Sequence, residues 1–326
     1  MFTDLFSEAR KCGASDIHLT TNSLPIMRIM GKLEAFSKEA ISHKQFNEFI
    51  ALLPTSVRTQ LEQLGEADCA WCWGEERYRL NIYRESEHYA MAIRLLQNNV
   101  PSTEELGLPD KLVQLMQQER GLVLVAGSTG SGKSTTLAAL VQKINATRAV
   151  HILTLEDPIE YTYPKGMALI HQREVGRDTS SFANGLRSAL REDPDVILVG
   201  ELRDSETMSI ALTAAETGHL VLATLHTQDV TSSVNRILDM LPQNQQQVRS
   251  QLAECFLAVA CQRLQARLDG QGRVAAFELL LATDAVRHLI REGQTHQLQS
   301  YLQTGARAGM QTMQASIAML KHKGII

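Results

Sequence analysis

The stretch Gly127-Ser128-Thr129-Gly130-Ser131-Gly132-Lys133-Ser134 decides the fold class of this chain. It satisfies the pattern G-x-x-x-x-G-K-[ST] at every fixed position. An apolar run, Leu122 to Ala126, precedes it, and a segment with helical patterning, Thr135 to Ile144, follows it. A strand, a glycine-rich loop and a helix in this order are typical of a phosphate-binding loop.

The residue types in this loop suit phosphate binding. Glycines let the backbone curl so that consecutive N–H groups point at phosphate oxygens, and the following helix adds its positive N-terminal end. We therefore expect Gly127 to Thr135 to bind the phosphates of a nucleotide. Lys133 would reach the β- and γ-phosphates, and the hydroxyl of Ser134 would be a ligand of Mg²⁺.

Short apolar runs separated by helical patterns continue along the chain. Besides Leu122 to Ala126, the runs are His151 to Leu155, Val196 to Val199 and Leu220 to Leu225. Further helices are predicted at Phe182 to Arg191 and at Ser205 to Thr217, the latter with Asp204 as its N-cap. This pattern predicts an α/β fold with a largely parallel sheet flanked by helices, whose ligands bind at the carboxyl ends of the strands.

The first part of the chain has a different texture. It mixes alternating segments such as Tyr78 to Tyr83 with amphipathic segments such as Phe46 to Leu53, which predicts an α+β domain. A polar stretch with a proline, residues 97–103, suggests a boundary. We expect a domain at 1–98, a linker at 99–110 and a second domain at 111–326, whose last 70 residues are predicted to be mainly helical.

Composition narrows the class of protein. With 326 residues, a net charge of −4 and 44% hydrophobic residues, the chain has the make-up of a globular protein, and nucleic acid is not an expected partner. The five cysteines are scattered, and the CxxC of Cys69 and Cys72 lacks the further ligands of a zinc site. No export signal begins the sequence, and no apolar run is long enough to span a membrane. A cytoplasmic protein with at most peripheral membrane contact is expected.

Acidic residues follow two of the predicted strands. Glu201 comes directly after Val196 to Gly200, at a position suited to holding the Mg²⁺ water shell or polarising the attacking water. Glu156, Asp157 and Glu160 follow the strand that begins at His151, and one of them can be the general base. Glu160 is the favoured one, but the sequence does not show which acid reaches the water, so the choice among these three stays open, as does a plain surface role for each.

Two histidines bracket the fourth predicted strand. His219 precedes Leu220 to Leu225 and His226 follows it. A histidine at the carboxyl end of a strand can donate a hydrogen bond to the γ-phosphate. An ordinary structural role is the alternative for both residues, more so for His219 than for His226.

The phosphate-binding loop by itself does not separate a kinase, a GTPase, a helicase and a motor. Taken with the other motifs, however, the chain resembles the PilT family of secretion and pilus ATPases. The residues that carry the resemblance are 127–140 (Walker A), 153–161 (an acidic box), 172–175 with 189–201 (the Walker B region) and 217–227 (a histidine box). The segment Ala285 to Glu292 is similar to the AIRNLIRE motif of the retraction branch, from which it departs at Val286 and His288.

The resemblance implies a RecA-like P-loop NTPase core with a PAS-like N-terminal domain, assembled as a homohexamer. Arginines of one subunit's N-terminal domain would then complete the ATP site of the next, and Arg77, Arg79 and Arg94 are the candidates. A common family arginine corresponds here to Glu87, with Arg84 nearby, so the identity of these arginines stays open.

For function, the resemblance implies an ATPase motor that uses ATP and Mg²⁺ to drive type IV pilus retraction and twitching motility. It implies action through an inner-membrane platform protein, and other pilus ATPases can be partners. The alternatives are a pilus assembly or type II secretion ATPase, an accessory retraction subunit, a small-molecule P-loop kinase and a non-catalytic nucleotide-binding scaffold.

Overall fold

The computed structural model describes residues 2–29, 31–36, 39–74, 76–86, 88–96, 99–270 and 272–326. The chain divides into two compact units, Met1–Asn98 and Asn99–Ile326, and each unit has a hydrophobic core of its own. A separate linker at 99–110 and a PAS-like character of the first unit stay predictions. Glu87, which bears on the choice of arginines, lies outside the described residues.

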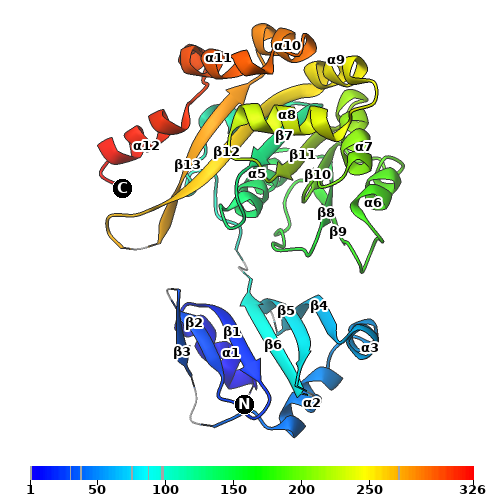
Figure 1. The fold of residues 1–326 in the computed structure, drawn as a ribbon, viewed down its shortest axis with the longest axis vertical. Helices are drawn as coiled ribbons and strands as arrows, with labels where there is room; N and C mark the ends of the chain where they lie inside the picture. The colour runs from blue at the N-terminus through cyan, green and yellow to red at the C-terminus, as the bar shows by residue number, and fades with distance from the viewer. Residues whose placement is uncertain are drawn as a thin grey trace. The chain divides into compact units, whose positions relative to one another are not determined.

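The first unit is a six-stranded antiparallel sheet of order β3-β2-β1-β6-β5-β4, packed against helices (Figure 1). Its elements are α1 (Phe2–Lys11), β1 (Ala14–Thr20), β2 (Ile26–Ile29), β3 (Lys32–Ala35), α2 (His43–Ala51), α3 (Thr55–Leu64), β4 (Glu66–Trp73), β5 (Glu76–Glu85) and β6 (His88–Leu95). Alternation in β5 buries Tyr78, Leu80 and Ile82 in the core, and Arg77 and Arg79 therefore lie on the other face.

The second unit is a seven-stranded sheet of order β13-β12-β7-β11-β10-β8-β9. Neighbouring strands are parallel except for β12 and β13. Its strands are β7 (Gly121–Ala126), β8 (His151–Glu156), β9 (Leu169–Glu174), β10 (Val196–Val199), β11 (Leu220–Leu225), β12 (Phe256–Ala266) and β13 (Arg273–Leu281). Its helices are α4 (Asp110–Gln114), α5 (Lys133–Thr147), α6 (Phe182–Ala189), α7 (Ser205–Glu216), α8 (Val230–Met240), α9 (Gln245–Cys255), α10 (Asp284–Arg291), α11 (Leu298–Thr304) and α12 (Met313–His322).

The largely parallel sheet with flanking helices confirms the predicted fold class. Strands β7 and β11 are buried along their whole length, as is usual for a parallel sheet covered on both faces. The predicted N-cap of α7 is also confirmed, because the side chain of Asp204 accepts a hydrogen bond from the Thr207 N–H.

The prediction of a mainly helical C-terminal region was wrong in part. Residues 256–266 and 273–281 form the antiparallel pair β12–β13, which extends the sheet beyond β7. The reason is physical: the first half of β12, residues 256–261, is a continuous apolar run, and such a run has no period that separates it from a buried helix.

Strand β13 is an edge strand whose free side is covered by the chain itself. The Phe277 N–H donates to Ser316 Oγ on α12 at 3.0 Å, and the Phe277 carbonyl accepts from Gln311 Nε2 at 2.9 Å. Leu279 and Gln311 exchange two backbone hydrogen bonds of 2.8 and 3.1 Å. The edge groups of β13 at these positions therefore have partners.

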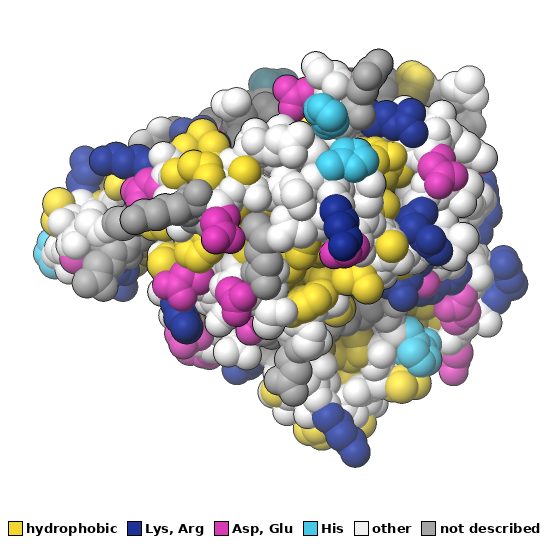
Figure 2. Space-filling model, turned by 90° about the horizontal axis from the view of Figure 1, so that it is seen from below, with side chains coloured by type: hydrophobic (Ala, Val, Ile, Leu, Met, Phe, Trp, Pro, Cys, Tyr) yellow, Lys and Arg dark blue, Asp and Glu magenta, His cyan; other side chains and the backbone are white. Residues whose placement is uncertain are grey.

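Among the described residues, none of the helices has the length and apolar character needed to cross a bilayer. Figure 2 shows acidic and basic side chains interspersed with apolar ones over one face of the molecule. Mixed signs of this kind are usual for the surface of a globular protein.

Candidate functional site

The loop between β7 and α5 has a backbone that requires glycine. Gly127, Gly130 and Gly132 have φ angles of +149°, +76° and +89°, a range that side chains rarely adopt. Space is limiting as well at Gly127, where an added Cβ would lie 2.5 Å from Ser131 Oγ and 2.6 Å from Gln262 O. The glycines therefore fix the shape of the loop.

Polar groups of the loop are arranged to receive an anion. Lys133 is buried, and its Nζ donates to the Gly127 carbonyl at 2.9 Å and to the Ser128 carbonyl at 3.1 Å. Ser131 Oγ is buried and has no hydrogen-bond partner within the described part of the chain. Within residues 127–135, all of which are described, the N–H groups of Gly130 and Gly132 donate to no backbone carbonyl. Phosphate oxygens would satisfy all of these donors.

Burial lowers the pKa of Lys133, while the charges of Glu201 and Glu160 act in the opposite direction. The negative charges of both carboxylates therefore oppose the effect of burial on the lysine of the loop. These two acids come from different strands, so the coupling is a property of the folded sheet.

The strand order explains how these groups meet. In the sheet, β7, β11, β10 and β8 are consecutive neighbours and run in parallel. Their carboxyl ends carry the phosphate-binding loop, His226, Glu201 and the segment from Glu156 to Glu160, in that order. The predicted convergence of these residues at one edge of the sheet is therefore what the topology produces.

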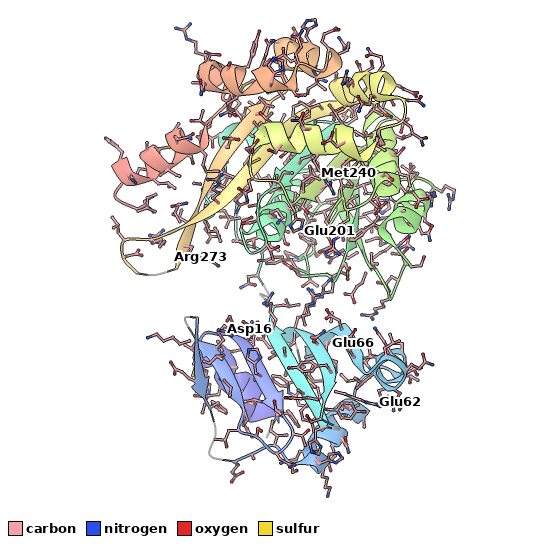
Figure 3. All side chains as sticks on the ribbon, viewed as in Figure 1. Asp16, Glu62, Glu66, Glu201, Met240 and Arg273 are labelled. Atoms are coloured by element: carbon pink, nitrogen blue, oxygen red, sulfur yellow. The ribbon has the colours of Figure 1, made fainter. Side chains whose placement is uncertain are left out.

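Glu201 is held by two basic side chains. Its Oε1 lies 2.5 Å from Arg203 Nε, and its Oε2 lies 3.3 Å from His226 Nε2 (Figure 3 labels Glu201). Only 12% of the Glu201 side chain is exposed, against 48% for His226. The carboxylate is thus oriented from both sides, while the histidine faces solvent.

Glu156 has a different environment, with neutral partners. Thr154 Oγ1 donates to its Oε1 at 2.7 Å, and Gln172 Nε2 donates to the same oxygen at 3.1 Å. Burial raises the pKa of Glu156, although these hydrogen bonds and one from the Glu160 N–H lower it. Because Glu160 and not Glu156 is coupled to Lys133, Glu160 is the better placed of the two acids for work at the phosphates. Asp157 is exposed.

His219 lies elsewhere. It precedes β11, and its carbonyl accepts from the N–H of Gly121, the first residue of β7, so it is at the amino end of the sheet. Its ring contacts the Ala214 carbonyl at 3.0 Å. The prediction that His219 shares the site of His226 is therefore not met within one chain, because the whole length of β11 separates the two histidines.

The three arginines predicted to act on a neighbouring subunit belong to the first unit. Arg79 donates to Asp68 through Nε and Nη2, with a shortest distance of 2.6 Å, and Arg94 Nε donates to Asp16 Oδ1 at 3.0 Å. Arg79 and Arg94 lie opposite each other on β5 and β6, and Arg77 is two residues earlier on the same face as Arg79. The structure thus groups them on one face of their own sheet.

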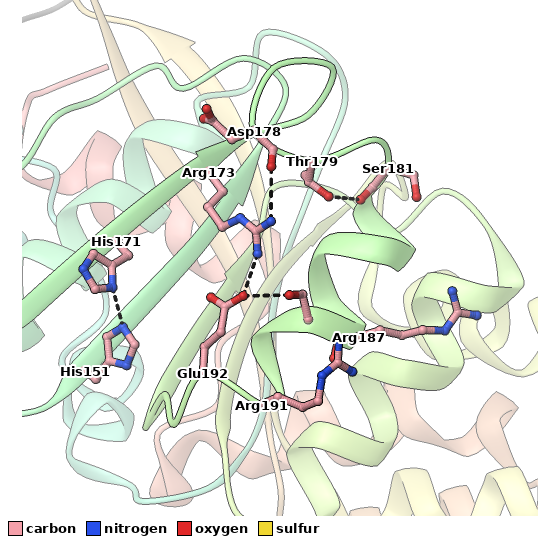
Figure 4. Close-up of polar contacts among 10 residues, drawn as sticks. His151, His171, Arg173, Asp178, Thr179, Ser181, Arg187, Arg191 and Glu192 are labelled. Atoms are coloured by element: carbon pink, nitrogen blue, oxygen red, sulfur yellow. Dashed lines mark hydrogen bonds and ion pairs between the residues drawn. The ribbon is translucent and has the colours of Figure 1, made fainter.

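Polar residues of the Walker B region form a network of contacts beside β9 (Figure 4). Arg173 Nη1 on β9 is 2.8 Å from Glu192 Oε1, which also accepts from Ser188 Oγ at 2.8 Å. Nearby, His151 Nε2 and His171 Nδ1 are 3.0 Å apart. These contacts tie β8 and β9 to the segment that leads into β10.

Sequence reasoning missed three residues that the fold adds to the site. Arg203 contacts Glu201, Tyr161 contacts Thr135 through the two hydroxyls at 2.9 Å, and Gln262 packs against the phosphate-binding loop. The sequence could have indicated Arg203, because it is a basic residue two positions after Glu201. The other two come from segments far away in the sequence, and no spacing rule points to them.

Mg²⁺ was predicted to bind near Ser134 and Glu201. The described residues contain no group of three or more His, Cys, Asp or Glu side chains that could hold a metal ion. This agrees with the chemistry of Mg²⁺ at nucleotides, because the ion takes one or two protein ligands and fills its other positions with phosphate oxygens and water. The exposed Ser134 hydroxyl at the start of α5 and the nearby carboxylate of Glu201 fit such an ion.

Together, the loop after β7, the acid after β10 and the parallel strand order define a P-loop nucleoside triphosphatase with a RecA-like core. A family model described as Type II/IV secretion system protein matches residues 84–322. The chain belongs to this family.

Individual relatives are similar over nearly the whole chain. The type IV pilus retraction ATPase PilT of Pseudomonas aeruginosa is 43% identical over 99% of this chain and 95% of its own length. A twitching motility protein of Neisseria gonorrhoeae is 45% identical over 93% of this chain and 82% of its own length. A crystal structure of the pilus retraction motor PilT with bound ADP has a TM-score of 0.92 at 42% identity and covers 99% of this chain and 93% of that one.

Proposed function

We propose that this chain is the ATPase subunit of a ring-forming motor that drives the retraction of type IV pili. One observation carries the enzymatic part: the phosphate-binding loop after β7, His226 after β11 and Glu201 after β10 lie at the carboxyl ends of three consecutive parallel strands of one sheet. The retraction part is supported by the similarity to PilT, which extends over both units of the chain.

The residues of the site have separate proposed roles in ATP binding and hydrolysis. The loop from Gly127 to Thr135 binds the phosphates of ATP, and Lys133 exchanges the carbonyls of Gly127 and Ser128 for phosphate oxygens. Glu201, oriented by Arg203 and His226, accepts a hydrogen bond from the attacking water. The Ser134 hydroxyl would hold Mg²⁺, and the ion would supply positive charge beside the phosphates.

Glu160 and His226 complete this assignment. Glu160 is proposed to polarise the water together with Glu201, because Glu160 follows β8 and Glu201 follows β10, which are neighbouring parallel strands. His226 contacts Glu201 with one ring nitrogen and is half exposed, so it can follow the loss of the γ-phosphate. Hydrolysis removes contacts that favoured one arrangement of the subunit, and the resulting shift becomes movement.

The assembly is proposed to be a ring of six copies in the cytoplasm that acts on an inner-membrane platform protein. In such a ring, Arg77, Arg79 and Arg94 of one subunit reach the ATP site of the next. The pairs Arg79–Asp68 and Arg94–Asp16 are at least partly exposed, and pairs of this kind contribute only about 0–1 kcal/mol. Releasing these arginines toward a phosphate therefore costs little.

Replacing Glu201 by Gln tests the enzymatic assignment. We expect the turnover number for ATP to fall by about a hundredfold or more, because a positioned base contributes on that scale, while binding of ADP stays within about twofold. Glu206→Gln makes the same chemical change on α7, where Glu206 pairs with Arg187, and should leave turnover unaltered. Full turnover in Glu201→Gln would remove Glu201 from the mechanism.

The biological role is tested by deleting the gene. Loss of twitching with pili retained on the surface is the expected result, and loss of surface pili would instead indicate an assembly ATPase. Hydrolysis by the purified ring without any acceptor molecule would rule out a small-molecule kinase.

A further inference from the structure

Gln262 lies where the C-terminal part of the sheet meets the phosphate-binding loop. Strand β12 runs parallel to β7, and Cys261 is paired with Ala126, the last residue of β7. Gln262, the next residue of β12, therefore lies beside Gly127, the residue that directly follows β7. Only 3% of Gln262 is exposed, an unusual degree of burial for a glutamine.

Gln262 contacts both ends of the loop. An added Cβ on Gly127 would be 2.6 Å from the Gln262 carbonyl oxygen, and one on Gly132 would be 2.9 Å from Gln262 Nε2. The loop thus begins and ends against the same residue, once against its backbone and once against its side chain.

The side chain of Gln262 is also bound to α5. Thr136 Oγ1, 1% exposed as a residue, donates to Gln262 Oε1 at 2.7 Å. Thr136 is in the first turn of the helix, three residues after Lys133. A buried hydrogen bond at this point fixes the position of the helix N-terminus, which is the part of the helix that faces phosphate.

We propose that Gln262 is a positioning residue of the nucleotide site, which holds the loop and the first turn of α5 in the phosphate-binding shape. The inference rests on the proposed function, because it needs the loop to bind a nucleotide. The loop contacts phosphates before, during and after hydrolysis, so its distortion weakens binding in all states to a similar extent. Loss of the Gln262 side-chain contacts therefore raises KM and the Kd for ADP and has little effect on kcat.

The test uses the full chain with Mg²⁺ and ADP, and it measures the Kd for ADP, the kcat and KM for ATP, and the Tm without nucleotide. Three variants are compared with wild type: Gln262→Met, which keeps the shape but not the amide, Thr136→Val, and the two combined. Gln265→Met is the matched control, since it makes the same change farther along β12.

We expect Gln262→Met and Thr136→Val each to raise the Kd for ADP by about tenfold, as the loss of one buried hydrogen bond predicts, with kcat within about threefold. Because the two residues share that bond, the double variant should bind no more weakly than the worse single variant. Gln265→Met should bind ADP as wild type does.

Two results would overturn the inference. If Gln262→Met lowers the Tm but binds ADP as tightly as wild type, the residue is only part of the core. If the effects of Gln262→Met and Thr136→Val simply add, the bond between them does not set the shape of the loop. A wild-type protein that fails to bind ADP would instead contradict the proposed function.

Discussion

Two glutamates at neighbouring strand ends show how surroundings set the role of a residue. Glu201 is flanked by Arg203 and His226, whereas Glu156 accepts hydrogen bonds from the neutral side chains of Thr154 and Gln172. Burial raises the pKa of Glu156. At the residue scale, the two acids are therefore not interchangeable, although both follow an apolar strand.

The raised pKa of Glu156 predicts a pH-dependent effect of Glu156→Gln on stability. A group with a raised pKa in the folded protein binds its proton more tightly there, so its contribution to stability is full at low pH and is lost as the pH rises through the folded pKa. Gln keeps an oxygen that can accept from Thr154 and Gln172 but never ionises. We therefore expect the Tm of Glu156→Gln, relative to wild type, to increase between about pH 4 and about pH 7.

The measurement is a set of thermal unfolding curves at several pH values, with Glu206→Gln as the exposed control. A Tm difference that stays constant across this pH range would show that burial of the Glu156 carboxylate does not destabilise the folded protein.

At the residue scale, the sequence alone predicts the site residues that belong to a local pattern. Lys133 and Ser134 follow from the spacing of the loop, and Glu201 follows from an apolar strand that ends in an acid. Gln262 and Tyr161 do not, because each meets its partner only after distant strands have paired. The amino-end position of His219 follows from its place before β11 in a parallel sheet, so its assignment to the site of His226 did not agree with the predicted fold.

At the scale of elements, the central strands were predictable and the C-terminal ones were not. Strands β7, β8, β10 and β11 are short apolar runs, and their predicted ranges match the observed ones within a residue, whereas the more polar edge strand β9 was not predicted. Strand β12 follows α9 without a loop, since α9 ends at Cys255 and β12 begins at Phe256. Where no turn residue marks the change, apolar composition alone does not give the type of element.

The loop between β7 and α5 predicts losses of stability of different size for two alanine substitutions. Gly127→Ala combines an unfavourable φ with overlap against Ser131 and Gln262. Gly130→Ala has an unfavourable φ but nothing within 4 Å of the added Cβ. We expect Gly130→Ala to cost about 1–2 kcal/mol of unfolding free energy and Gly127→Ala to cost clearly more, about 3 kcal/mol or above.

Urea unfolding without nucleotide, followed by far-UV circular dichroism, measures these costs. Equal costs for the two variants would mean that the contacts of Gly127 relax freely and that φ alone determines the requirement for glycine.

At the scale of the whole molecule, the two separate cores predict two unfolding events. Both tryptophans, Trp71 and Trp73, lie in the first unit, so tryptophan fluorescence reports that unit, while circular dichroism reports both. We expect the two probes to give unfolding curves that do not coincide. Phe49→Ala should destabilise the first unit and shift the fluorescence curve, and Leu212→Ala should destabilise the second unit and shift only the circular dichroism curve. Each substitution should lower the free energy of unfolding of its unit by about 2–5 kcal/mol. Coinciding curves would mean that the units unfold as one.

The proposed ring predicts complementation between two inactive subunits. Lys133→Ala removes phosphate binding but keeps Arg94, and Arg94→Ala keeps the loop but removes the arginine. If Arg94 acts on the neighbouring subunit, each variant alone should lose about a hundredfold or more of its ATPase activity, and a mixture of the two should recover part of it. Arg58→Ala, on α3, is the control for loss of a positive charge from the same unit. A mixture as inactive as its components would place Arg94 outside the neighbour's site.

The covered edge of β13 has a consequence for handling the protein. An uncovered strand of nine residues with an apolar sequence is a template for pairing with other chains, and such pairing leads to aggregates or fibrils. Here Ser316 and Gln311 occupy the backbone groups that a second strand would use. Detachment of α12, by proteolysis or by truncation, would remove Ser316 from the edge of β13 and would be expected to promote aggregation.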